Sequence, residues 1–214
     1  MVEAHVPDRG RCLDLLVKGQ EVVLVEVAAR EGMPARRTGY TVLLARARTA
    51  PSPWVSLDPA GAPRLVEAAL ERGMLPEFAG YEVVGREVAV PRMRLRPRPR
   101  IDLLLRAPST AEMPCEVKSV GAAREGIAWF PDAPTLRGLR HLAVLARRAR
   151  RGLPAGLVLC AQRGDVRAIA ADEEIDAPFA RALRAARRAG VRIAGLACAA
   201  HPDGMELLGP LPVL

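Results

Sequence analysis

The chain has 214 residues, of which 50% are hydrophobic and 3% aromatic, so one large domain or two small ones must pack mainly through Leu, Val, Ala and Ile. Its net charge of +8 favours polyanionic partners such as nucleic acid or an anionic membrane surface, with the codon bias of a GC-rich genome as the alternative source of the arginines. The sequence shows no signal peptide and no apolar run of ~18 residues, which argues against secretion and a membrane span. Its cysteines are not paired in sequence, which argues against a zinc site and a disulfide framework. We therefore expect a cytoplasmic protein.

The first quarter of the chain is predicted to be rich in β-strands. Strand-like runs lie at residues 22–25, 40–44 and 54–57. Together they resemble part of a small barrel or meander. A Pro- and Gly-rich segment, residues 58–63, then suits a domain junction. We therefore expect a β-rich domain over residues 1–57 and a second domain over residues 58–214.

The second domain is predicted to alternate helices and strands. Helices are expected at residues 64–72, 134–151 (with Pro134 in the first turn) and 176–189 (with Asp176 as the cap). Strands are expected at residues 81–90, 100–106, 115–120, 157–160 and 191–196. The order is helix, three strands, helix, strand, helix, strand. It predicts an α/β fold in which helices pack on a sheet.

Two carboxylates and a lysine are expected to converge on that sheet. Asp102 lies in an apolar strand, where burying a carboxylate is costly unless a cation or donors compensate. Glu116 and Lys118 are two residues apart, so they share one face of the next strand. Such a trio suits Mg²⁺ or Mn²⁺ chemistry on a phosphodiester, with the Val117 carbonyl as a further ligand. A structural salt bridge of Lys118 with Glu116 or Asp102 is the alternative.

Arginines recur at every second position before Asp102. This arginine row consists of Arg92, Arg94, Arg96, Arg98 and Arg100. In an extended strand these side chains share one face, and Asp102 continues the same parity. The row is therefore predicted to lie along a phosphate backbone, with a solvated loop as the alternative.

The long helix is predicted to carry a second basic surface. Arg137 and His141 are four residues apart, and Arg140 lies between them, so all three are expected to contact a phosphate near the metal. For the arginines between Arg147 and Arg151, an ordinary solvated face near the helix C-terminus is the better interpretation.

The second domain resembles the sugar fermentation stimulation protein A family. The resemblance runs from about Ala79 to the C-terminus. It is carried by Arg100-Ile101-Asp102, by residues 116–120, by residues 130–142, and near the end of the chain by Ile175-Asp176, Ala189-Gly190-Val191, Asp203-Gly204-Met205 and residues 210–214.

This resemblance implies an OB-type barrel followed by a PD-(D/E)XK nuclease-like domain with a mixed sheet flanked by helices. It implies a bacterial DNA-binding protein associated with regulation of sugar (maltose) metabolism genes. Asp102 and Glu116 become metal ligands and Lys118 the catalytic lysine. Glu67 is the candidate for the first-helix acid of the pattern, with Glu87 behind it.

Departures from the family pattern affect both domains. The barrel looks shortened, and its histidine-led loop survives only as residues 5–10. In the long helix, Leu136 and Leu139 stand where an acid and an amide-type residue are expected.

We interpret the chain as a sequence-tolerant DNA-binding protein with a nuclease-type site. The alternatives are a non-catalytic regulator of sugar metabolism with a vestigial site, and an RNA-directed or partner-binding module that reuses the fold. The oligomeric state stays open, with a homodimer as one option. No Ser-centred elbow, P-loop or dinucleotide motif supports other chemistry.

Overall fold

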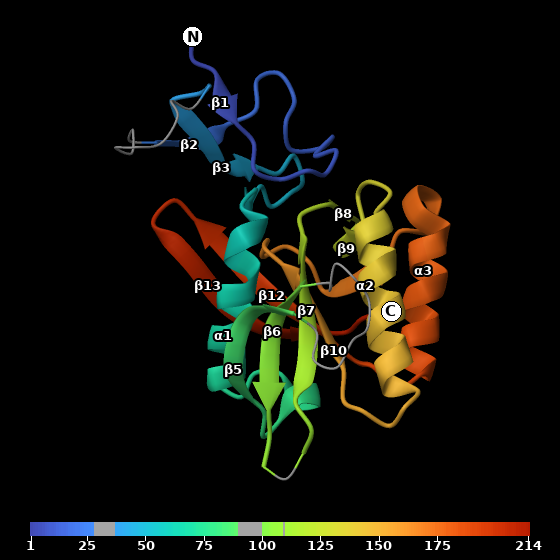
Figure 1. Ribbon diagram of the computed structural model, residues 1–214. Helices are drawn as coiled ribbons and strands as arrows, with labels where there is room; N and C mark the ends of the chain where they lie inside the picture. The colour runs from blue at the N-terminus through green and yellow to red at the C-terminus, as the bar shows by residue number, and fades with distance from the viewer. Residues whose placement is uncertain (28–36, 90–99, 109) are drawn as a thin grey trace.

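In the computed structural model, which describes residues 1–27, 37–89, 100–108 and 110–214, one ten-stranded mixed sheet joins the two halves of the molecule (Figure 1). Its strands are β1 (Ala4–His5), β2 (Val22–Glu26), β3 (Tyr40–Arg46), β4 (Trp54–Ser56), β5 (Glu82–Ala89), β6 (Arg100–Arg106), β7 (Met113–Val120), β10 (Gly156–Ala161), β12 (Arg192–His201) and β13 (Gly204–Leu211). The order is β1-β3-β4-β12-β10-β7-β6-β5, with β2 paired to β3 and β13 to β12.

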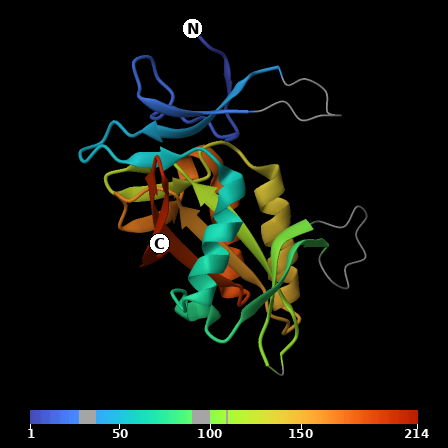
Figure 2. The same ribbon diagram turned by 90° about the vertical axis from the view of Figure 1, so that its left-hand side faces the viewer.

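The helices cover the two faces of the sheet unequally (Figures 1 and 2). The α-helices are α1 (Ala62–Glu71), α2 (Leu136–Ala149) and α3 (Glu173–Arg188), and short 3₁₀ turns lie at Pro59–Gly61 and Pro76–Phe78. Helix α1 packs on one face, and α2 and α3 pack side by side on the other. The mixed sheet flanked by helices predicted from the sequence is confirmed.

The central strand β10 shows why the sheet needs helices on both of its faces. All six of its residues are buried. Because strand side chains alternate, Leu157 and Leu159 pack with α2 and α3, whereas Val158 and Cys160 pack towards α1. Strand β10 is parallel to both neighbours, β7 and β12, which is the arrangement expected for an apolar strand covered on both faces.

The N-terminal β-strands build a separate small core. It contains Leu15, Val42, Val55 and Leu57, all buried. Antiparallel β2–β3 and β3–β4 pairs frame it, and a single bridge between Trp54 and Ala200 continues the sheet into the second half. Figure 1 shows this region above one end of the larger sheet.

Several elements differ from the sequence-based expectation. Strand β13 and the small sheet of β8 (Ala123–Arg124), β9 (Ile127–Phe130) and β11 (Ala168–Ala171) were not predicted. Helix α2 begins at Leu136, after the N-cap Thr135, so the prediction that Pro134 lies in its first turn is wrong.

Asp176 lies within α3 rather than at its start. The helix is capped by Asp172, and its backbone leaves helical geometry at Asp176, with φ −147°. The Asp176 carboxylate accepts a hydrogen bond from the Phe179 N–H at 2.9 Å, so it caps the part that follows the kink. Pro178 is accommodated there because it falls in the first turn of that part.

One buried arginine ties the two halves together. Arg163 follows β10 and is fully buried. It donates to both Asp165 oxygens at 2.7 and 2.8 Å and to the Gly121 carbonyl at 2.7 Å, and Asp14 of the N-terminal region lies 3.8 Å away. Asp165 also accepts from Thr49 at 2.9 Å. A buried charge is tolerated only when it is paired in this way.

No helix in the described ranges is long and apolar enough to cross a membrane.

Replacing Asp165 by Asn should lower the free energy of unfolding by about 3 kcal/mol at pH 7, because Arg163 loses its main counter-charge. Urea denaturation of wild type and D165N measures this difference in the free energy of unfolding. The matched control is E21Q, which breaks an exposed pair with Arg46 and should cost below about 1 kcal/mol.

The difference in stability between wild type and D165N should depend on pH. Burial raises the pKa of Asp165, but the hydrogen bonds and charge of Arg163 outweigh burial and leave this pKa below its ordinary value. The carboxylate therefore stabilises the fold above the unfolded pKa of about 3.9. This contribution is lost as the pH falls through the lower folded pKa, so the difference between wild type and D165N should shrink at strongly acidic pH. A constant difference would contradict this assignment.

Candidate active site

Asp102 and Glu116 lie on the adjacent strands β6 and β7, close enough for the charge of Glu116 to raise the pKa of Asp102. The register places Leu103 opposite Cys115, so Asp102 and Glu116 follow as the next opposed positions. The side-chain carboxylate of Asp102 accepts a hydrogen bond from the backbone N–H of Val117 at 2.8 Å. Along β6, Ile101, Leu103 and Leu105 are buried, whereas Asp102 and Leu104 between them are partly exposed, so Asp102 follows the regular alternation of the strand. The hydrogen bond with Val117 holds its carboxylate against β7.

Glu116 is the most buried polar group of the site, with 1% of its surface exposed. Its Oε1 atom contacts both Lys118 Nζ, from the same strand, and His141 Nδ1, from α2. Its Oε2 atom is buried and has no hydrogen-bond partner among the described residues. Buried carboxylate oxygens are nearly always satisfied, so an unpartnered one points to a ligand that binds there.

The two carboxylates have opposite protonation tendencies. Burial raises the pKa of Asp102, and the neighbouring charge of Glu116 raises it further. Burial also raises the pKa of Glu116, but the His141 hydrogen bond and the Lys118 charge outweigh burial and lower it overall. Glu116 is therefore held as an anion, whereas Asp102 would take its charged form more readily beside a bound cation.

A divalent cation fits this donor set. The Oε2 atom of Glu116 and the Asp102 carboxylate supply hard anionic oxygens from opposed strand positions. In the described residues, no group of three His, Cys, Asp and Glu side chains is placed to hold a metal. Two carboxylates suit Mg²⁺ nevertheless, because Mg²⁺ keeps several waters and is commonly held by one or two carboxylates.

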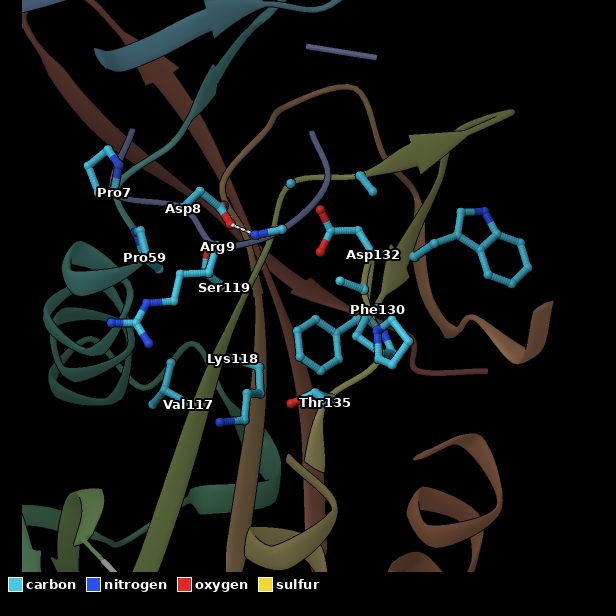
Figure 3. A pocket seen from close by; sticks show the side chains of 17 residues that line it. Pro7, Asp8, Arg9, Pro59, Val117, Lys118, Ser119, Phe130, Asp132 and Thr135 are labelled. Carbon is cyan, nitrogen blue, oxygen red and sulfur yellow. Dashed lines mark hydrogen bonds between the residues drawn. The ribbon is translucent and has the colours of Figure 1, made fainter. Parts of the chain in front are cut away.

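A cavity of about 360 Å³ opens beside Lys118 (Figure 3). Strand β7 contributes Val117 to Ser119, the segment from Phe130 to Thr135 forms a second wall, and residues 7–10 of the N-terminal region form a third. Three parts of the chain that are far apart in sequence thus meet next to the candidate metal ligands.

The predicted DNA-contacting residues lie in different surroundings. Arg137 and Arg140 are exposed on the first turns of α2. His141 is buried beside Glu116 and does not share their exposed face, since the helix turns it towards the sheet. Arg100 is exposed and forms an ion pair with Glu87 at 3.6 Å. The rest of the arginine row, Arg92, Arg94, Arg96 and Arg98, lies outside the described residues.

Glu67, the candidate first-helix acid, lies on α1. Both of its oxygens accept hydrogen bonds from Arg86, at 2.6 and 2.8 Å. Helix α1 packs on the face of the sheet opposite to the His141 side of Glu116. The role of Glu67 stays a prediction.

Sequence reasoning missed the N-terminal contribution to this site. Arg9, Asp8 and Asp132 line the cavity with Lys118. In the sequence, Asp8 and Arg9 belong to residues 5–10, which resemble only a shortened family loop. Asp132 falls within residues 130–142, and the family resemblance of that stretch is the one signal for it.

The second half of the chain has the features of a restriction-endonuclease-like domain. Strands β12-β10-β7-β6-β5 carry α1 on one face and α2 and α3 on the other, and an Asp and a Glu-x-Lys lie on adjacent strands. The family described as sugar fermentation stimulation protein RE domain matches residues 60–204, and the SfsA N-terminal OB domain matches residues 1–57. The chain therefore belongs to the sugar fermentation stimulation protein (SfsA) family.

Individual relatives agree with this assignment. A sugar fermentation stimulation protein homolog of Chloroflexus aggregans is 45% identical, covering 100% of this chain and 76% of the relative. One from Alkalilimnicola ehrlichii is 40% identical over 99% of this chain and 86% of the relative. The structure of Pyrococcus furiosus SfsA in complex with Ca²⁺ matches with a TM-score of 0.83 and 25% identity, over 100% of this chain and 86% of that one.

Divalent cations should stabilise the folded protein through Asp102 and Glu116. At a cation concentration about 100-fold above Kd, linkage gives about 2.7 kcal/mol, which corresponds to a rise in Tm of roughly 5–10 °C. Differential scanning fluorimetry with Mg²⁺, Mn²⁺ or Ca²⁺ measures it. D102N and E116Q should each lose the rise, whereas D203N, at an exposed carboxylate, should keep it. Equal shifts in all four proteins would place cation binding elsewhere.

Proposed function

We propose that this protein binds DNA and hydrolyses phosphodiester bonds with Mg²⁺ or Mn²⁺ at Asp102 and Glu116. The observation that carries the proposal is the buried, unpartnered Oε2 atom of Glu116 beside Lys118. When bound, a divalent cation neutralises charge on the scissile phosphate and makes water a better nucleophile.

The protein's own side chains divide the remaining work. Glu116 is held deprotonated by Lys118 and His141, so it is ready to bind a cation at neutral pH. The Val117 N–H orients Asp102, and the Val117 carbonyl is our candidate for a further ligand. Lys118 Nζ positions the attacking water or offsets the negative charge that develops on the phosphate. The water oxygen then forms a bond to phosphorus as one P–O ester bond breaks, and the proton that the water loses ends on the released alkoxide oxygen.

The net charge of the chain and the arginines of α2 support DNA binding. The chain carries a net charge of +8, and Arg137 and Arg140 extend from the helix that begins at the cavity wall. We propose that they contact phosphates, together with Arg100 and the other members of the arginine row, Arg92, Arg94, Arg96 and Arg98. His141 touches Glu116, so we assign it the orientation of that carboxylate rather than a phosphate contact.

A second candidate function is a non-catalytic DNA-binding regulator of sugar metabolism genes. The observation that favours it is that the part of the chain described by the structure has no group of three His, Cys, Asp or Glu side chains placed to hold a metal ion. The two candidates share DNA binding and differ only in turnover.

Cleavage should depend on Lys118 but not on the other lysine of the chain. With plasmid or single-stranded DNA and Mg²⁺ or Mn²⁺, K118A should lower the cleavage rate at least about 100-fold, as expected for loss of a group that stabilises transition-state charge. K18A removes an equal charge from an exposed position in the N-terminal half and should cleave like wild type. E116A should be inactive. If wild type binds DNA and never cleaves it, the regulator is the correct function.

The phosphate contacts of α2 should appear in the salt dependence of binding. Each contact contributes about 0.9 to the slope of log Kd against log salt on duplex DNA, so R137A/R140A should lower the slope by about 1.8. R181A/R188A is the matched control, because it removes two exposed arginines from α3. A slope that falls equally in both double variants would contradict contacts specific to α2.

A further inference from the structure

Positively and negatively charged side chains lie at opposite ends of the cavity beside Lys118. Figure 3 shows Lys118 and the Arg9 guanidinium at the end near Val117, and the Asp8 and Asp132 carboxylates at the other end. A phosphate is attracted to the Arg9–Lys118 end and repelled from the carboxylates. The carboxylates instead accept N–H donors, such as the amino groups of nucleobases.

The acidic end is held in place by the N-terminal segment. Asp8 accepts from the Gly10 N–H at 2.7 Å, and Asp132 accepts from the Cys12 N–H at 3.4 Å. Gly10 lies so close to Asp132 that a Cβ at this position would fall 2.0 Å from a carboxylate oxygen. The absence of a side chain at Gly10 therefore lets the two halves of the molecule close around the cavity.

The wall between the two ends is aromatic. The ring of Phe130 lies against the cavity and is held from behind by an edge-to-face contact with Phe179, at 5.1 Å between centroids. In sites that bind single-stranded nucleic acid, aromatic rings serve as stacking surfaces for unpaired bases.

The size of the cavity limits what can enter it. At about 360 Å³ it lies at the lower end of the roughly 300–1,000 Å³ found for small-molecule sites. It admits one nucleotide, whereas the body of a duplex must remain outside. A base that enters has to leave the helical stack, which costs least in a single strand.

We propose that this cavity binds one unpaired nucleotide of a single-stranded DNA substrate, with its phosphate between Arg9 and Lys118 and its base against Phe130. The proposal rests on the proposed function, for which it names single-stranded DNA as the substrate class. It also gives the OB-type region a defined part in the site, because Arg9 comes from that region and reaches the nuclease-like domain.

Fluorescence anisotropy in the presence of Ca²⁺ tests the proposal with two labelled probes. One is a 12-nucleotide single strand and the other a closed hairpin duplex without free ends. Wild type should bind the single strand on the order of tenfold more tightly than the hairpin. R9A should weaken single-strand binding by about tenfold or more, as for loss of a charged hydrogen bond, and hairpin binding by less than about threefold.

The matched control is R11A, which removes the same charge two residues away, from an exposed side chain that lines a neighbouring cavity. It should leave the ratio of the two affinities unchanged. Equal losses in R9A and R11A, or a hairpin bound as tightly as the single strand, would overturn the proposal while leaving DNA binding intact. Failure of wild type to bind either probe would overturn the proposed function as well.

Discussion

The burial of the Glu116 carboxylate is the constraint on which the rest of the site depends. A carboxylate this deep in a sheet would normally take up a proton, because an apolar environment disfavours its charge. Lys118 and His141 prevent this, and they do so through one oxygen only. The second oxygen keeps its charge and has no partner in the described chain. The arrangement thus fixes a deprotonated carboxylate at a defined position, which is what a cation site requires.

The supporting structure follows from that requirement. Strand β7 must be covered on the Glu116 side by α2, which brings His141, and on the other side by the core beneath α1. The N-terminal region then closes the open end of β7, where the cavity forms. Arg163, buried between Asp14 and Asp165, ties this region to the nuclease-like domain. Asp132 adds a second tie, because it accepts a hydrogen bond from the Cys12 N–H, three residues after Arg9.

Short-range patterns in the sequence were sufficient to predict where the two carboxylates and the lysine lie, while their roles came from the family resemblance. A polar residue in an apolar strand and a spacing of two residues both follow directly from strand geometry, so Asp102, Glu116 and Lys118 could be placed on neighbouring strands. The position of His141 could not, because a helical spacing from Arg137 says which residues are neighbours but not which face meets the sheet. Arg9 lines the same cavity as Lys118 although more than one hundred residues separate them in sequence, and such a long-range arrangement leaves no periodic signal.

The structural and catalytic interpretations of the Lys118–Glu116 pair need not exclude each other. If the pair were only a structural bridge, both carboxylate oxygens should be satisfied, since a buried unpartnered oxygen costs stability. If Lys118 served only catalysis, Glu116 would lack its main compensating charge and would tend to become protonated. The observed contacts meet both needs at once, because the ion pair holds Glu116 charged while leaving Oε2 open. A working site and a vestigial one would therefore both retain the ion pair. Only a working site has a reason to keep Oε2 of Glu116 without a partner.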